Sequence, residues 1–371
     1  MTVQPPRATT ANRGDGVPVT NLPTLMTFED AVARADRLSE SKQLLLGNGF
    51  SIGAHPDFAY KRLYDEACKE GLSDRVKGVF DHFGTANFED ILKRLDEGVW
   101  LADQYGLQPS LDGPTMQDDH QGVKSALTSV ITRIHPPSRN HVDGKALLAC
   151  AQFLERFDSV FTTNYDILAY WAFLAKDPPA LRDCFFEEGG DGYRIFEIPN
   201  SGGKTIHYLH GALHIYTRDG EVRKRTVDGG IVLIDKVREG LDSKEYPLIV
   251  TEGDSTQKMA RIEASGYLSW CLQEFQLVDK TLFIYGSSLG DPDEHLWRAI
   301  VENRHLERIV VGVNGNGTSA KNKEVIARAT RLGERRKTWA AKIPVSVSDL
   351  KVRFFNSTTA PVWAVPGTSD P

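Results

Sequence analysis

The chain has 371 residues, of which 40% are hydrophobic and 25% charged, and these fractions are typical of a globular protein with a sizeable core. Its formal net charge of −6 disfavours direct nucleic-acid binding, which needs a concentrated basic surface. No apolar run is long enough to predict a membrane span, and the 4 cysteines form no CxxC pair for a zinc ribbon. Scattered cysteines suit a reducing compartment, so we expect a cytoplasmic protein.

Composition along the chain predicts one domain with two insertions. Residues 1–22 are rich in Pro, Thr, Asn and Gly and predict a flexible leader, and residues 367–371 predict a loose tail. Between them, residues 23–366 are expected to form a single domain. Amphipathic helical patterns prevail from about 72 to 157 and predict an inserted helical lobe. Residues 178–206 carry Pro-Pro and Gly-Gly pairs and predict an irregular insertion with short strands.

The first strand signal is a continuous apolar run at 43–46, typical of a strand that is buried on both faces. A helix is expected at 58–70. Strand, glycine turn and helix together place backbone N–H groups against a phosphate. The motif is short, however, and a purely structural turn is an equal alternative. The turn residues that would bind a nucleotide are Gly47, Asn48, Gly49, Phe50 and Ser51.

A second strand, at 159–161, ends in the sequence TTNYD. Thr163 and Asp166 are expected to contact a nucleotide, Asp166 by accepting a hydrogen bond from an amide. Asn164 is expected to position a hydroxyl or a water molecule. The alternative is that Asn164 or Asp166 only caps the helix that follows.

A third strand, at 205–209, ends at His210. A histidine at a strand exit is well placed to transfer protons, because its pKa is naturally near the working pH. The alternative is a core histidine with a satisfied hydrogen bond. Alternation along the strand puts His207 on the opposite face from His210, which disfavours a metal site shared by the two.

From residue 247 onward, strand and helix signals alternate, which predicts a parallel sheet. A strand is expected at 246–253 and another at 281–285. The latter ends in three small residues that suit a second ribose: Gly286, Ser287 and Ser288. Asp291 or Asp293 is expected to cap the next helix rather than to bind a metal.

These polar loops all follow strands that we expect to be parallel. In open parallel α/β sheets, ligands bind beyond the carboxyl ends of the strands. The sequence therefore predicts an α/β fold with a Rossmann-like parallel sheet, helices on both faces, and one pocket that collects the loops. Glycines for phosphate, polar groups for sugar and a histidine for proton transfer indicate a nucleotide-cleaving site.

Taken in order, the motifs resemble those of the sirtuin-like superfamily, and more closely its zinc-free bacterial branch. GNGFS corresponds to the GAG-x-S loop of that family, TTNYD is similar to its TQN-x-D motif, LHG to its catalytic histidine motif, and GSS to its GTS ribose motif. PLIVTEG, YLSWCL and IYGSSLGDPDEHLWRAI resemble the bacterial branch. The resemblance covers roughly residues 24–365. It departs from protein-deacylating sirtuins in lacking the four-cysteine ribbon and in its longer gap between Asn164 and His210, which argues against peptide binding.

The resemblance implies a sirtuin-like fold and NAD as the substrate, with no metal. It implies an NAD glycohydrolase that releases nicotinamide and ADP-ribose, with Asn164 and His210 as catalytic residues, acting in antiphage defence. The main alternative is a non-catalytic module that senses NAD or ADP-ribose and acts through a partner protein; a zinc-free deacylase is a weaker one. A homo-oligomer is expected, and a translocase-type ATPase is a candidate regulatory partner.

Overall fold

The structure is a computed structural model that describes most of the chain. The described residues are 22–38, 41–107, 113–179, 181–187, 193–199, 202–226 and 233–363. All of the expected leader except Leu22, and the expected tail, lie outside them. No helix among the described residues is long and apolar enough to cross a membrane.

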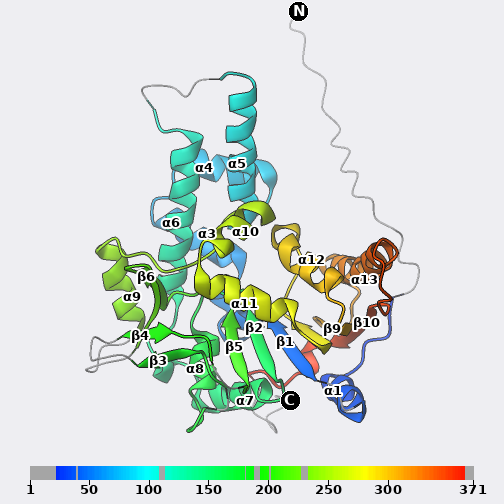
Figure 1. Cartoon of the computed structure of the whole chain (residues 1–371). Helices are drawn as coiled ribbons and strands as arrows, with labels where there is room; N and C mark the ends of the chain where they lie inside the picture. Colours follow the sequence, from blue (N-terminus) through cyan, green and yellow to red (C-terminus); the bar gives the residue numbers. More distant parts are fainter. Residues whose placement is uncertain are drawn as a thin grey trace, which may run out of the picture.

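Six parallel strands form the main sheet (Figure 1). They are β1 (Lys42–Leu46), β2 (Ser159–Thr162), β5 (Thr205–Tyr208), β8 (Lys280–Tyr285), β9 (Leu306–Val313) and β10 (Lys351–Asn356). Their spatial order is β10-β9-β8-β1-β2-β5, and every neighbouring pair is parallel. The chain extends the sheet from β1 in one direction and then returns to β8 on the other side of β1. This is the Rossmann-like strand order, so the predicted fold class is confirmed.

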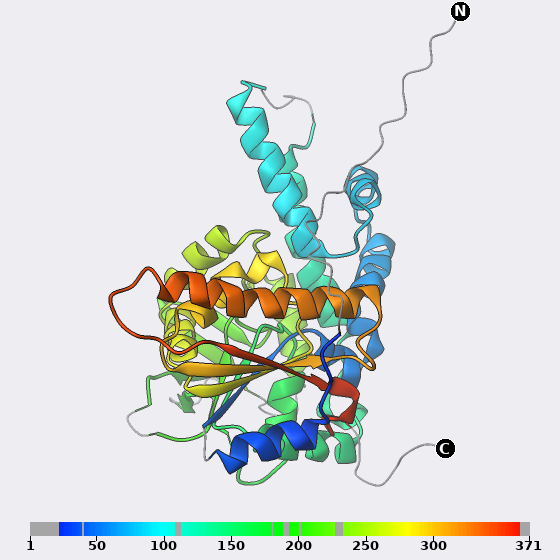
Figure 2. The same ribbon diagram turned by 90° about the vertical axis from the view of Figure 1, so that its right-hand side faces the viewer.

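Helices cover both faces of the sheet, which explains why its central strands are continuous apolar runs. On one face, Phe28 of α1 packs against Phe283 of β8 and Phe153 of α7. On the other face, Phe161 of β2 packs against Phe275 of α11. Figure 2 shows α1 and α13 on opposite sides of the strands. The covering helices are α1 (Phe28–Arg37), α7 (Gly144–Leu154), α11 (Gly266–Gln276), α12 (Glu294–Glu302) and α13 (Ala320–Ala340).

The helical lobe, defined here as α3 to α6, rises from the edge of the sheet (Figure 1). It consists of α3 (Tyr60–Lys69), α4 (Asp74–Phe83), α5 (Phe88–Gln104) and α6 (Met116–Ile134). A capping box at Thr115 and Asp118 starts α6. The insertion expected at about 72–157 contains most of these helices. The last helix in that range, α7, does not belong to the lobe but packs with α1 on one face of the main sheet.

A second, antiparallel sheet lies beside the first in the order β3-β4-β7-β6. Its strands are β3 (Phe185–Glu187), β4 (Tyr193–Phe196), β6 (Ile215–Arg218) and β7 (Glu221–Arg225), with α9 (Leu233–Asp242) following. The β6–β7 hairpin turns at Asp219 and Gly220, whose φ angles are 54° and 81°. Positive φ at both positions matches the twist of a tight hairpin, as the Asp-Gly pair predicts.

One local prediction was wrong. The strand expected at 246–253 is absent: Leu248 donates to the carbonyl of Ile215, the first residue of β6, and Ile249 makes only an isolated bridge with Gly211 in the turn after β5. The helix expected at 58–70 is present as α3, but a shorter helix, α2 (Gly49–Ala54), begins inside the glycine turn and precedes it.

The remaining short elements are η1 (Pro56–Phe58), η2 (Arg139–His141), α8 (Leu168–Phe173), α10 (Ser255–Glu263), η3 (Asp291–Asp293) and η4 (Ser357–Thr359).

Candidate active site

One cavity of about 1020 Å³ opens at the carboxyl edge of the main sheet. Residues that follow all six parallel strands line it, and α3, α5 and α6 of the helical lobe contribute to its wall. Ten of the twelve predicted site residues line this cavity: Gly47, Asn48, Gly49, Thr163, Asn164, Asp166, His210, Gly286, Ser287 and Ser288. The structure therefore brings loops that are distant in sequence together around one cavity. The ligand that these residues bind stays a prediction.

The glycine loops after β1 and β8 pack directly against each other. The backbone N–H of Gly49 donates to the carbonyl of Gly286 at 2.8 Å, and Gly47 donates to Tyr285 at 2.9 Å. A Cβ on Gly286 would lie 2.6 Å from the backbone nitrogen of Phe50, and Gly286 has a φ of +73°. These positions therefore require glycine for a structural reason: the two loops approach each other closely at the point where the strand order reverses.

Phe50 and Ser51 lie behind the cavity wall rather than in it. Both are fully buried, and the Phe50 ring packs against Trp363 with centroids 4.8 Å apart. The hydroxyl of Ser51 donates to Asp166 and accepts from the amide of Asn164. Ser51 thus connects the β1 and β2 loops, and its hydroxyl is not free for a phosphate as the sequence suggested.

Asn164 is held by its amide nitrogen. Its Nδ2 donates to the carbonyl of Gly47 at 3.1 Å and to Ser51 Oγ at 2.7 Å. Its Oδ1 receives no hydrogen bond from the described residues, so this oxygen can accept one from a ligand in the cavity. Asp166 is less available, because its oxygens accept from Ser51 and from the backbone of Leu168. Burial raises the pKa of Asp166 above its ordinary value.

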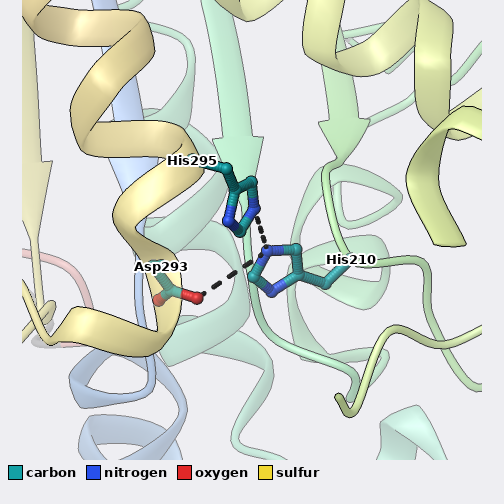
Figure 3. Close-up of side chains that lie close together, drawn as sticks. All are labelled: His210, Asp293 and His295. Carbon is teal, nitrogen blue, oxygen red and sulfur yellow. Dashed lines mark hydrogen bonds and ion pairs between the residues drawn. The ribbon is translucent and has the colours of Figure 1, made fainter. Parts of the chain in front are cut away.

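His210 lies in the turn after β5, and only 1% of it is exposed. Its Nε2 is 3.1 Å from Nε2 of His295 and 3.9 Å from Oδ1 of Asp293, as Figure 3 shows. The Nδ1 atom of His295 lies 3.3 Å from the hydroxyl of Ser255. His207 points elsewhere, as alternation predicts: it stacks on Phe161 with centroids 4.7 Å apart. The four side chains from Ser255 to His210 and Asp293 thus form a buried polar network.

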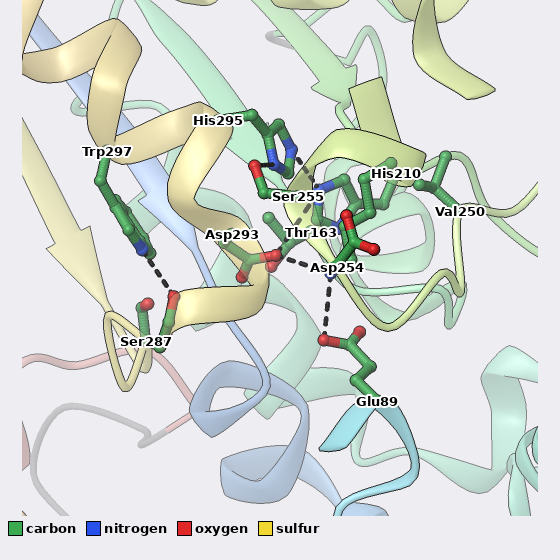
Figure 4. Close-up of polar contacts among 12 residues, drawn as sticks. Glu89, Thr163, His210, Val250, Asp254, Ser255, Ser287, Asp293, His295 and Trp297 are labelled. Atoms are coloured by element: carbon green, nitrogen blue, oxygen red, sulfur yellow. Dashed lines mark hydrogen bonds and ion pairs between the residues drawn. The ribbon is translucent and has the colours of Figure 1, made fainter. Parts of the chain in front are cut away.

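A second group of charges adjoins this network (Figure 4). The buried ammonium of Lys258 donates to Asp293 at 2.8 Å and to Glu89 of the helical lobe at 3.0 Å. The hydroxyl of Tyr165 lies 2.9 Å from Glu89 and 2.7 Å from the carbonyl of Val250. A phenol carries one proton and a carbonyl only accepts, so a protonated Glu89 that donates to Tyr165 satisfies every group. The lobe therefore contacts the site through Glu89.

The directions in which the pKa values of these groups are shifted agree with this arrangement. Burial raises the pKa of Glu89 above its ordinary value, which favours the protonated carboxyl. Burial also acts to raise the pKa of Asp293, but the charge and hydrogen bond of Lys258 outweigh it, and the value is about 2. Burial and the charge of Lys258 keep the pKa of His210 well below its ordinary value. At neutral pH the site then holds an ionised Asp293, a charged Lys258 and a neutral His210.

His210, Asp293 and His295 could also be considered as a metal site, since three potential ligand atoms lie within 4.8 Å of one another. Lys258 argues against this interpretation. Its ammonium lies 2.8 Å from Asp293 Oδ1, so a divalent cation at the same carboxylate would meet a buried positive charge. The expected capping role of Asp293 is wrong: it occupies the N-cap position of α12, but its side chain makes no capping hydrogen bond.

Sequence analysis missed Glu89 and Lys258 and did not assign His295 to the site. Glu89 and Lys258 are 169 residues apart, so no local motif could join them. One signal was present: Lys258 shares a face of α10 with the buried Ile262, and a charge on an apolar helix face requires a partner.

The family model described as "Domain of unknown function (DUF4917)" matches residues 44–363. The chain belongs to this family. Every cavity residue named above lies within the DUF4917 match. No curated protein matches the chain. Among solved structures, one described as "Structural Basis for the Mechanism and Regulation of Sir2 Enzymes" is similar, with 13% identity and a TM-score of 0.29 over 85% of this chain and 100% of that chain. The Rossmann-like fold follows from the strand order of the main sheet.

Proposed function

We propose that the protein is an NAD glycohydrolase, which hydrolyses the bond between nicotinamide and ribose. The observation that supports this most is that Asn164 and His210, from different strands, line one large cavity at the carboxyl edge of a Rossmann-like sheet. The two residues also lie in motifs that resemble those of the sirtuin-like superfamily. The antiphage role, the homo-oligomer and the translocase-type partner stay predictions of that resemblance.

In the proposed orientation, the pyrophosphate lies along the loop at 47–49 and the adenosine ribose near Ser287 and Ser288. The nicotinamide ribose lies between Asn164 and His210. Cleavage of the glycosidic bond passes through a state with oxocarbenium character at the anomeric carbon. Nicotinamide leaves from a cationic nitrogen as a neutral molecule, so its departure needs no acid. What the site must supply is a positioned water and a proton acceptor.

Asn164 Oδ1 is the group that orients the water or a ribose hydroxyl, because its amide nitrogen is already bonded to the protein. His210 accepts the proton of the attacking water. The water oxygen forms the new bond to the anomeric carbon, and the electron pair of the broken bond stays on nicotinamide. The depressed pKa of His210 keeps this acceptor unprotonated at neutral pH.

The test is incubation of the purified protein with NAD, with nicotinamide and ADP-ribose quantified by mass spectrometry. We expect both products in equal amounts, and a loss of roughly 10²–10⁴-fold in turnover for His210→Ala. His305→Ala is the matched control, since His305 is an exposed histidine at the amino end of β9. Thermal unfolding of each variant checks that the fold survives. If His210→Ala turns over NAD as fast as the wild type, or if the wild type binds NAD without forming product, the proposal is wrong; the second result would favour a sensing module.

A further inference from the structure

His210 contacts the protein through one ring nitrogen only. Its Nε2 faces His295 at 3.1 Å and Asp293 at 3.9 Å, whereas no described residue is hydrogen-bonded to its Nδ1. The side chain lines the cavity. Of its two nitrogens, Nδ1 is therefore the one left for a ligand or a water molecule.

Two neutral imidazoles whose Nε2 atoms lie within hydrogen-bond distance must share one proton between those atoms. Either His295 donates, and His210 then carries its own proton on Nδ1, or His210 donates from Nε2 and keeps a lone pair on Nδ1. Only the second form makes Nδ1 a base. The hydroxyl of Ser255, which faces His295 Nδ1, can donate or accept and so does not select either form.

Asp293 distinguishes the two forms. Its carboxylate is ionised and lies 3.9 Å from the Nε2 atom of His210. A proton on Nε2 is favoured beside this negative charge, and a lone pair there is disfavoured. The other charged group that faces the pair is Lys258, and its ammonium is bonded to Asp293 and Glu89 instead.

We propose that Asp293 and His295 are positioning residues that hold the proton of His210 on Nε2 and so make Nδ1 the atom that accepts a proton in the cavity. This inference rests on the proposed function, in which His210 is the proton acceptor. In the step itself, the proton of the attacking water passes to Nδ1. The imidazolium that forms donates from Nε2 toward His295 and lies beside the negative charge of Asp293. The proton later returns to solvent, and no other reactant is needed.

The tautomer can be measured without any turnover. In the full-length protein labelled with ¹⁵N histidine, two-bond ¹H–¹⁵N correlations show which nitrogen of each of the 10 histidines carries the proton. The signals that disappear in His210→Ala identify His210. We expect a protonated Nε2 and an unprotonated Nδ1 near neutral pH. A proton on Nδ1, or a stoichiometric transition metal in the purified protein, would overturn the proposal, since a metal would take both Nε2 atoms as ligands.

Asp293→Asn removes the charge that selects the tautomer. Glu89, the other partner of Lys258, must then ionise if the buried ammonium is to keep a counter-ion, so thermal unfolding of the variant is measured beside that of the wild type. We expect the Nδ1–H form to grow and kcat to fall about 10²–10⁴-fold with little change in KM, as a wrong tautomer does in other histidine-dependent enzymes. An unchanged tautomer in Asp293→Asn would refute the positioning role.

His295 has a conservative control of its own. His295→Gln offers an amide oxygen that can still accept from Nε2, whereas His295→Phe offers none. We expect the Gln variant to retain more of kcat than the Phe variant, and equal losses would count against a positioning role. If the wild type shows the expected tautomer but does not consume NAD, the proposed function fails and the tautomer assignment stands, so the two failures are distinguishable.

Discussion

At the residue scale, the site depends on polar groups that hold one another in place. Asn164 uses its amide nitrogen to join the β1 and β2 loops and leaves its oxygen free for a ligand. Lys258 is fully buried and neutralises Asp293 beside His210. A buried ion pair is costly to break, because the remaining charge has neither water nor a counter-ion.

This cost gives a stability prediction for Lys258. We expect Lys258→Met to lower the free energy of unfolding by up to roughly 3 kcal/mol, because Asp293, whose side chain is 22% exposed, is left without its counter-ion. The double variant Lys258→Met/Asp293→Asn should recover much of the loss, since both charges are then gone. Urea unfolding of the two single variants and the double variant measures the coupling. Additive effects in this double-mutant cycle would mean that the pair does not interact as the structure shows.

At the scale of elements, the contact between the β1 and β8 loops forms the floor of the cavity. Gly286→Ala should destabilise the protein by about 2 kcal/mol or more, because L-residues disfavour positive φ and the added Cβ meets backbone. Gly78 is the matched control: it lies inside α4, and a Cβ there would meet nothing within 4 Å. Gly78→Ala should stabilise by up to about 1 kcal/mol. Thermal unfolding of the two variants measures these changes in stability. Equal effects at the two sites would contradict the close approach of the β1 and β8 loops.

The elements that local patterns specify were predictable from the sequence. The Asp219-Gly220 pair forms the tight hairpin that such a pair favours, and the helix expected at 58–70 is present as α3. The strand exits at Asn164 and His210 also meet at one cavity. The segment near Ile249 was not predictable, because a strand needs a partner strand and the sequence does not show that this one faces a turn. The role of Glu89 was equally hidden, since it depends on how the helical lobe lies over the sheet.

At the scale of the whole molecule, buried histidines predict sensitivity to acid. Burial lowers the pKa of His135 and His295 to about 4 and that of His207 to about 3, and it holds the pKa values of His210 and His214 well below their ordinary value. Unfolded histidines take up protons near their ordinary pKa of about 6.5, so stability is present above that pH and is lost as the pH falls below it.

Each such histidine should reduce the free energy of unfolding by about 1.4 kcal/mol per pH unit between its two pKa values. His207→Phe tests this, since a phenyl ring can keep the stack on Phe161 but cannot take up a proton. We expect the variant to show a shallower loss of stability between about pH 6 and about pH 4.5 in urea unfolding. An identical pH dependence for variant and wild type would show that His207 is not held neutral.

The proposed function requires that loops from six strands bind a single dinucleotide, with its scissile bond beside Asn164 and His210. A crystal structure with ADP-ribose, the product that retains the pyrophosphate and both riboses, tests this most directly. We predict density in the cavity, with the pyrophosphate against the loop at 47–49 and the anomeric hydroxyl within hydrogen-bonding reach of Asn164 Oδ1 and His210 Nδ1. An ADP-ribose bound outside this cavity, or bound in it with the anomeric carbon turned toward Ser287 and Ser288, would contradict the account.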